Sequence, residues 1–127
     1  MPRDLAVEWL KSAIKDAEKV LPQNAARAQL QLLVERLRFL QTEGFNADLP
    51  LKRLQGKFRK LSELRVKGGA LGKSNIRVFF SVIENRVVIL GVTKKEKEGA
   101  LNYVYETMLQ RLEDYELRCA SKERRQS

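Results

Sequence analysis

The chain of 127 residues contains no histidine and a single cysteine, Cys119. One cysteine excludes an internal disulfide framework, and without histidine the usual zinc-ligand sets are missing. We therefore expect neither a metal site nor another cofactor. No apolar run approaches the roughly 18 residues that cross a bilayer, and the start, MPRDLAVEWLKS, has acids within its apolar pattern, unlike a secretory signal. The expectation is a cytoplasmic protein with no membrane partner.

Acidic residues are the minority charge. The chain has 25 Lys and Arg against 16 Asp and Glu, a formal net charge of +9. This balance favours a polyanionic partner, nucleic acid first, with an anionic membrane or an acidic protein as alternatives. The length fits one domain. We assign residues 1–117 to that domain and residues 118–127, RCASKERRQS, to a charged tail that is expected to fray.

Two amphipathic helices are predicted in the first third of the chain. Apolar residues recur at helical spacing over residues 4–20, with Asp4 as the N-cap, and over residues 24–43, where Gly44 follows as a C-cap glycine. Pro22 separates the two segments. The short connection between them predicts an αα-hairpin.

Further along, the apolar period changes to two. Residues 63–67, 75–84 and 86–93 are typical of strands, and the glycine-rich segment 68–74 is typical of a flexible hairpin loop. A last helix is predicted over about residues 98–117. The expected fold class is α+β: an N-terminal αα-hairpin, an antiparallel sheet of three or four strands and a C-terminal helix, with the helices packed on one face of the sheet.

Positive charge is concentrated where the helices give way to the strands. Between residues 52 and 67 there are seven Lys or Arg and one acid, Glu63. Cations fixed on a stiff sheet can hold a polyanion in a defined geometry, whereas cations on a flexible tail only attract it. The sequence therefore favours this part of the chain as the nucleic-acid-binding surface.

Four short motifs follow one another at family-like spacing: LKRLQGKFRKLSELRVK from Leu51, NIRVFFSV from Asn75, VVILGVTKKEKEGA from Val87 and RLEDY from Arg111. With the order of elements, they resemble the RelE/HigB superfamily of toxin endoribonucleases, most closely its phage-derived HigB-like branch. The resemblance implies the toxin of a type II toxin-antitoxin system, which cleaves mRNA, commonly at the ribosome, and inhibits translation. It also implies a cognate antitoxin, often of the helix-turn-helix type, which would cover the basic sheet or add a strand to it.

The chain departs from the family pattern at two places. Family members usually begin with a β-strand, whereas a helix is expected here from residue 4. The branch often has a histidine before the Lys-Lys pair, where this chain has Gly91-Val92-Thr93. A noncatalytic RNA- or protein-binding member of the same fold is therefore an alternative. A DNA-binding regulator is a weaker one, because the first two helices show no clear helix-turn-helix pattern.

RNA cleavage without histidine needs other groups. The 2′-hydroxyl must lose a proton, the phosphorane charge must be stabilised, and the leaving 5′-oxygen must gain a proton. We assign charge stabilisation to Arg65 and Arg77. Because clustered cations lower the pKa of a lysine, Lys67 or Lys94 is the candidate base, with Glu63 as a weaker one. Cations and one aromatic around these positions are assigned to RNA binding: Lys57, Arg59, Lys60, Lys73, Phe79 and Lys95.

Each assignment has a structural alternative. Glu63 and Arg65, two apart on one strand, can simply pair with their neighbours, and Arg77 among apolar residues can be a satisfied structural arginine. Phe79 can belong to the core instead of stacking a base. The Lys94–Lys95 pair can be a solvated strand end.

Overall fold

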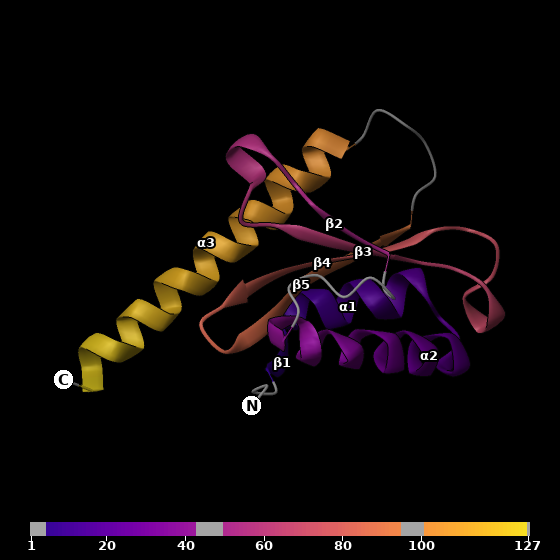
Figure 1. Ribbon diagram of the computed structural model, residues 1–127, viewed down its shortest axis with the longest axis horizontal. Coiled ribbons are helices and arrows are strands. Elements are labelled where there is room, and N and C mark those ends of the chain that lie inside the picture. The colour runs from indigo at the N-terminus through magenta and orange to yellow at the C-terminus, as the bar shows by residue number, and fades with distance from the viewer. Residues whose placement is uncertain (1–4, 43–49, 95–100, 127) are drawn as a thin grey trace.

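The computed structural model describes residues 5–42, 50–94 and 101–126. Its centre is a five-stranded sheet of order β1-β5-β4-β3-β2 (Figure 1). β1 pairs with β5 in parallel, and the other neighbours are antiparallel. The strands are β1 (Ala6–Trp9), β2 (Leu51–Arg53), β3 (Ser62–Val66), β4 (Ile76–Ile83) and β5 (Arg86–Lys94).

The N-terminal strand β1 corrects the sequence prediction. A helix was expected over residues 4–20, but α1 spans Lys11–Val20 and β1 precedes it. Along β1 the side chains alternate between exposed and half-buried, which is the period of a strand. Four residues are too few for this period to stand out against the helical pattern that follows. The first strand that the family resemblance calls for is therefore present, and Asp4, the expected N-cap, lies outside the described residues.

The sheet is also larger than expected, with five strands instead of three or four. The additional strand on the other side, β2, is three residues long and pairs with the beginning of β3. Its sequence, Leu-Lys-Arg, carries two charges and no apolar alternation. Short, charged strands are common at sheet edges because they discourage pairing with other chains.

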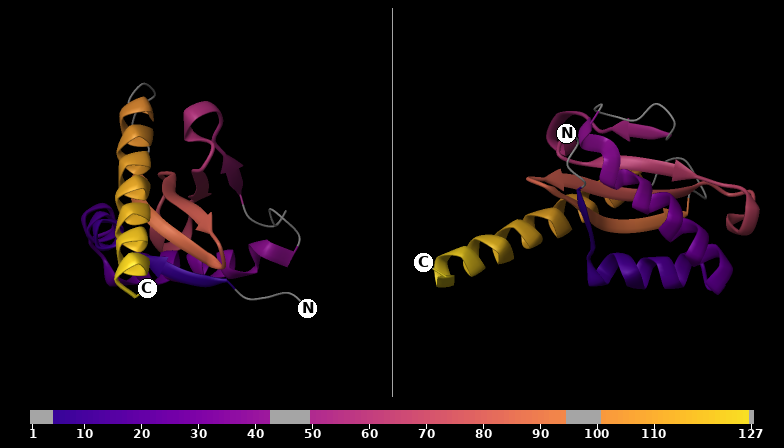
Figure 2. Two further views of the ribbon diagram at one scale, coloured as in Figure 1. Left: turned by 90° about the vertical axis from the view of Figure 1, so that its left-hand side faces the viewer. Right: turned by 60° about the horizontal axis from the view of Figure 1, so that its bottom comes forward.

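Helices cover both faces of the sheet, whereas one covered face was predicted. α1 and α2 (Asn24–Glu35) form the expected hairpin on one side, and α3 (Leu101–Gln126) crosses the other side (Figures 1 and 2). α2 runs on as the 3-10 segment η1 (Arg36–Thr42), so the prediction over residues 24–43 covers two elements; Gly44 lies outside the described residues. Coverage from both sides explains why β4 is buried without interruption from Ile76 to Ser81.

The end of α3 is a further correction. A frayed tail was expected after residue 117, but the helix continues to Gln126, and its last turns extend past the sheet (Figure 1). The segment has neither glycine nor proline and is rich in Arg and Lys, which favour helix. None of the helices within the described ranges has an apolar stretch long enough to span a bilayer.

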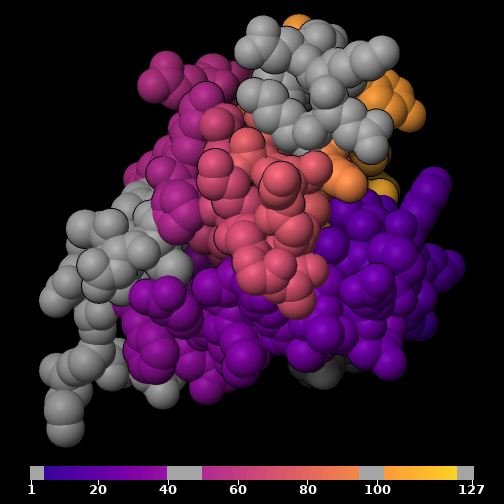
Figure 3. Space-filling model, turned by 90° about the vertical axis from the view of Figure 1, so that its right-hand side faces the viewer, coloured from indigo at the N-terminus to yellow at the C-terminus, as the bar shows by residue number. Residues whose placement is uncertain are grey.

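The glycine-rich connection between β3 and β4 is ordered by α2. It contains the 3-10 turn η3 (Gly69–Leu71), and Gln29 of α2 donates to the carbonyl oxygen of Gly68 at 3.1 Å and accepts from the amide of Ala70 at 2.8 Å. Gly69 has φ of +55°, and a Cβ there would lie 2.8 Å from Oε1 of Gln29. Figure 3 shows this connection projecting beside the indigo and purple helices. The predicted flexible loop is thus a fixed part of the end of the sheet.

Candidate functional site

Arg65 and Arg77 lie directly opposite each other on β3 and β4. Paired residues of antiparallel strands point to the same face of a sheet, and side chains alternate along each strand. The same face therefore carries Glu63 and Phe79, which are the next pair, and Thr93 of β5, which pairs with Arg77. The predicted convergence of the two arginines on one face is thus what the strand register gives.

Glu63 joins the two arginines. Its Oε1 accepts a hydrogen bond from Nε of Arg65 at 2.9 Å and lies 3.1 Å from Nε of Arg77. The side chains of Glu63 and Arg77 are 0% and 2% exposed, whereas that of Arg65 is 37% exposed. We call these three residues the arginine–glutamate triad. It carries one net positive charge and reaches the surface through Arg65.

Burial decides the roles available to Arg77 and Glu63. A guanidinium that is 2% exposed does not fit the predicted contact of Arg77 with a phosphate, and the alternative of a structural arginine describes it better. The carboxylate of Glu63 is fully buried and faces two cations. It is not accessible to a 2′-hydroxyl, so its weaker assignment as a base does not fit either. Arg65 keeps the exposure that a phosphate contact needs.

The candidate bases lie on different sides of the sheet. Lys67 is exposed, follows β3 directly and stands two residues beyond Arg65, on the same face by strand alternation. Lys94 is exposed at the end of β5 but pairs with Ile76, whose neighbour Arg77 points the other way. Lys73 is exposed in the β3–β4 connection. Lys95 lies outside the described residues.

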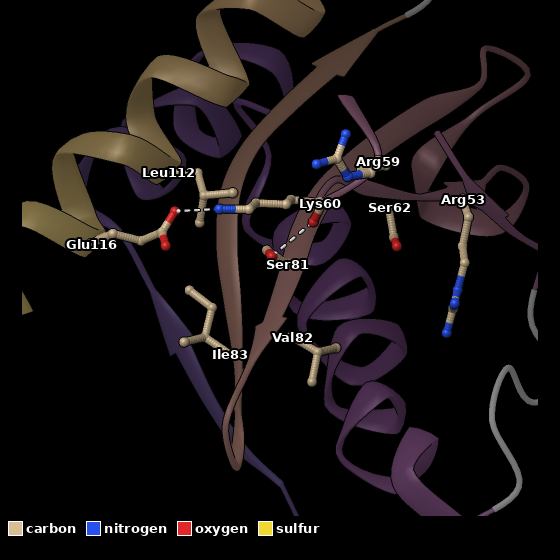
Figure 4. Close-up of a pocket in the computed structure, with 9 residues that line it drawn as sticks. All are labelled: Arg53, Arg59, Lys60, Ser62, Ser81, Val82, Ile83, Leu112 and Glu116. Atoms are coloured by element: carbon tan, nitrogen blue, oxygen red, sulfur yellow. Dashed lines mark hydrogen bonds and ion pairs between the residues drawn. The ribbon is translucent and has the colours of Figure 1, made fainter. Parts of the chain in front are cut away.

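A second basic group lines a cavity of about 400 Å³ near the other end of β3 (Figure 4). Ser62, at the start of β3, belongs to this lining, and about 10 Å of strand separates it from Arg65. Nζ of Lys60 lies 3.7 Å from Oε1 of Glu116 on α3. The hydroxyl of Ser81 donates a hydrogen bond to the backbone carbonyl oxygen of Lys60 at 2.8 Å. Further cationic side chains in the lining are Arg53 and Arg59. Of the predicted RNA-binding residues, Arg59 and Lys60 therefore lie together at this cavity, away from Arg65, so the predicted cations do not form one patch.

Two predicted RNA-binding residues contact α3, Phe79 in the core and Lys57 at the surface. Phe79 is fully buried and meets Tyr105 edge to face, with ring centroids 5.8 Å apart. Its assignment as a platform for a base is wrong, because no face of the ring is open. Lys57 forms an ion pair with Glu106 of α3 and lies over the ring of Phe58 at 5.1 Å.

Sequence reasoning missed the cavity and the buried pair. The cavity brings together the end of β2, the start of β3, the end of β4 and α3, and no local motif links these segments. The sequence contained one signal for the pair of Glu63 and Arg77. An arginine within an apolar strand is expected to be buried, and a buried charge is normally paired with an opposite charge. Among the described residues, no group of three His, Cys, Asp or Glu side chains is placed to hold a metal ion.

The chain is similar in fold to solved structures that include a RelE toxin and a RelB-RelE antitoxin-toxin complex. The Escherichia coli toxin RelE, solved in the free state as a double arginine-to-alanine mutant, superposes with a TM-score of 0.58 and 17% identity over 85% of this chain and 97% of its own. A chain of the RelB-RelE antitoxin-toxin complex from Methanococcus jannaschii gives 0.50 and 17% over 78% and 95%. No family model and no curated protein matches the chain. The expected α+β fold of the RelE type is confirmed.

Proposed function

We propose that this protein is the toxin of a toxin-antitoxin system and an endoribonuclease that cleaves mRNA at the ribosome, thereby inhibiting translation. One observation carries the proposal: on a RelE-type sheet, Glu63 holds Arg65 by its Nε while 37% of the Arg65 side chain stays exposed, and the exposed Lys67 follows two residues later. A guanidinium in this position suits a phosphate, because its two outer nitrogens match two phosphate oxygens.

The chemistry assigned to the site needs no metal. Attack of the 2′-hydroxyl on the adjacent phosphorus forms the new P–O bond and breaks the bond to the 5′-oxygen, which takes a proton from solvent water, leaving a cyclic phosphate and a 5′-hydroxyl. Arg65 stabilises the extra negative charge of the phosphorane. Lys67, which is exposed two residues beyond Arg65, is assigned to take the proton of the 2′-hydroxyl. Lys94 is the second choice, since its register places it on the opposite face from Arg77.

A cognate antitoxin is part of the proposal. A relative of this fold was solved with its antitoxin, and β1 is the edge of the sheet to which an antitoxin segment can add a strand, since the short, charged β2 at the other edge discourages pairing. With a net charge of +9, the toxin favours an acidic contact surface on its partner. We further propose that the antitoxin carries a helix-turn-helix domain and that the toxin belongs to the HigB-like branch.

A noncatalytic RNA-binding protein of the same fold is the second candidate. The chain has no histidine, and Glu63 and Arg77 are both committed to a buried contact. Such a protein would bind RNA through the exposed Arg65 and Lys67 and through the cavity at the other end of β3. Its affinity would fall with salt, because displaced counterions drive the contact of cations with phosphates.

Purified protein added to a translation reaction separates the two candidates. The endoribonuclease is expected to cut the message within its coding region, and the Arg65→Ala variant is expected to leave it intact. Lys15→Ala is the matched control, since it removes one exposed cation from α1, outside the site. Salt-sensitive RNA binding with full-length message throughout would identify the noncatalytic protein instead.

A further inference from the structure

We infer that Glu63 is a positioning residue which, supported from below by Arg77, holds Arg65 by its Nε so that both outer nitrogens face the phosphate of the bound RNA. The inference rests on the proposed function, because it gives the exposed arginine of that site its fixed orientation. In this inference, the buried contact between Glu63 and Arg77 serves to align the side chain of Arg65.

The triad is graded in exposure. Glu63 and Arg77 are buried at 0% and 2%, and Arg65 emerges with 37% of its side chain exposed. The three side chains share one face, since Glu63 precedes Arg65 by two residues and Arg77 pairs with Arg65 across the strands. A rigid sheet therefore fixes the origin of every member. The mobile end that remains is the outer part of Arg65.

Engagement through Nε determines which donors stay available. A guanidinium has one N–H at Nε and two on each Nη. Glu63 takes the Nε–H at 2.9 Å, and within the described part of the chain no hydrogen bond or ion pair is made by either Nη of Arg65. Both Nη groups thus keep their donors for a bidentate contact with an oxyanion.

Arg77 makes this arrangement electrostatically useful. A buried carboxylate that faced Arg65 alone would cancel the positive charge offered to the phosphate. With Arg77 3.1 Å from the same oxygen, the triad keeps a net positive charge. Oε2 of Glu63 and Nη2 of Arg77 are buried and have no hydrogen-bond partner among the described residues.

The decisive variant replaces the buried pair and spares Arg65. Glu63→Leu with Arg77→Met leaves the net charge unchanged and exchanges a buried ion pair for apolar side chains of similar size, a change that is often neutral for stability. We expect a folded protein that binds uncleavable, 2′-O-methylated RNA within about threefold of wild type but cleaves RNA at least about 10-fold more slowly, because a misaligned group loses rate. The matched control is Glu35→Leu with Arg38→Met, a surface pair with a 3.1 Å contact, expected to cleave normally.

A conservative pair tests alignment should the apolar pair fail to fold. Glu63→Gln with Arg77→Gln keeps an acceptor oxygen for the Nε–H of Arg65 without burying a charge. This variant is expected to cleave RNA faster than the apolar pair does. If the apolar pair does not fold, the comparison is with Glu63→Leu/Arg77→Gln, which lacks the acceptor and is expected to cleave more slowly. If every folded variant of the pair cleaves at the wild-type rate, Glu63 only packs the sheet and the inference is overturned.

Two further readouts separate this inference from the proposed function. If the Arg65→Ala variant still cleaves RNA, the proposed site is wrong. If Arg65→Ala is inactive but the variant Glu63→Leu/Arg77→Met is fully active, only the inference about Glu63 is wrong. The NMR signal of the Arg65 Nε–H needs no activity. We expect slow exchange of this proton with water in the wild type and fast exchange once Glu63 is replaced. Equal exchange in both proteins contradicts the inferred hold on Arg65.

Discussion

Arg111 of α3 donates a hydrogen bond at 2.9 Å to the carbonyl oxygen of Leu90, the residue of β5 at which the strand register shifts. Phe79 of β4 pairs with Gly91 and Phe80 pairs with Ile89, so Leu90 between them has no partner on β4. The same nitrogen of Arg111 donates to Asp16 of α1 at 2.7 Å. Asp16 in turn accepts from the amide of Val92 at 3.2 Å. The two helices on opposite faces of the sheet are thus tied together at this bulge.

Loss of that tie is expected to weaken the fold. Arg111→Met keeps the aliphatic stem but removes the donors to Leu90 and Asp16, and should lower the free energy of unfolding by about 2 kcal/mol, as for hydrogen bonds with charged groups. Asp16→Asn keeps an acceptor for the Val92 amide and should cost less. Urea unfolding of the wild type and the two variants measures both losses of stability. If Arg111→Met loses less stability than Asp16→Asn, the bulge is not held by Arg111.

Arg77 is expected to matter more for stability than Arg65 does. Arg77→Met alone leaves the carboxylate of Glu63 buried without its inner partner, a situation that typically costs about 3–5 kcal/mol. Arg65→Met removes the half-exposed partner and should cost about 1 kcal/mol or less. Paired denaturant melts test this order. For the same reason Arg77→Ala is a poor test of activity, since lost cleavage would follow from lost folding. Equal melts for the two variants would contradict the buried ion pair.

Gly91 is expected to resist enlargement. A Cβ at this position would lie 2.3 Å from Cε of Met108 and 2.7 Å from Nη1 of Arg111. Gly91→Ala should therefore destabilise the protein by about 1–3 kcal/mol through overpacking. Met108→Ala should also destabilise it, by leaving a cavity. The double variant should lose less stability than the sum of the losses of the two single variants, because the smaller side chain at position 108 makes room for the new methyl group. If thermal unfolding shows that the two losses of stability add, α3 does not pack against Gly91.

Tyr115 gives a pH dependence of stability. Its hydroxyl donates to Oε2 of Glu8 on β1 at 2.6 Å, and burial together with this hydrogen bond raises the pKa of Tyr115 above its usual value near 10. As the pH rises, Tyr115 loses its proton at a lower pH in the unfolded chain than in the folded protein. Its contribution to the free energy of unfolding is therefore complete below a pH of about 10 and declines above it. Tyr115→Phe should be less stable by about 1 kcal/mol at pH 7. The gap to wild type should narrow as the pH rises above 10, and a gap that widens would refute this assignment.

The sequence was informative wherever a segment's environment could be inferred from its own residues. The apolar run of β5 placed that strand, and the helical periods identified α1 and α2 although not their bounds, because each element buries a continuous or periodic surface. β1 was hidden, since four alternating residues precede a helix with a stronger pattern. β2 was hidden because an edge strand of three residues needs no apolar signal.

The site followed the same rule. Arg65 and Arg77 were placed on one face because strand alternation is a local property. The burial of Arg77 depends on Glu63 of a neighbouring strand, and that of Phe79 depends on Tyr105 of a helix that follows much later in the chain. Neither fact is contained in the residues next to them. The cavity beside Lys60 and Glu116 likewise exists only after α3 has crossed the sheet.

The most direct test of the central claim maps transcript 5′ ends in cells that express the protein. Wild type and the control Lys15→Ala are expected to stop growth and to create new 5′ ends inside coding sequences. Arg65→Ala, at equal abundance and with a normal melt, is expected to create none. New 5′ ends that persist with Arg65→Ala, or growth arrest by wild type without any new ends, would contradict an endoribonuclease built around this arginine.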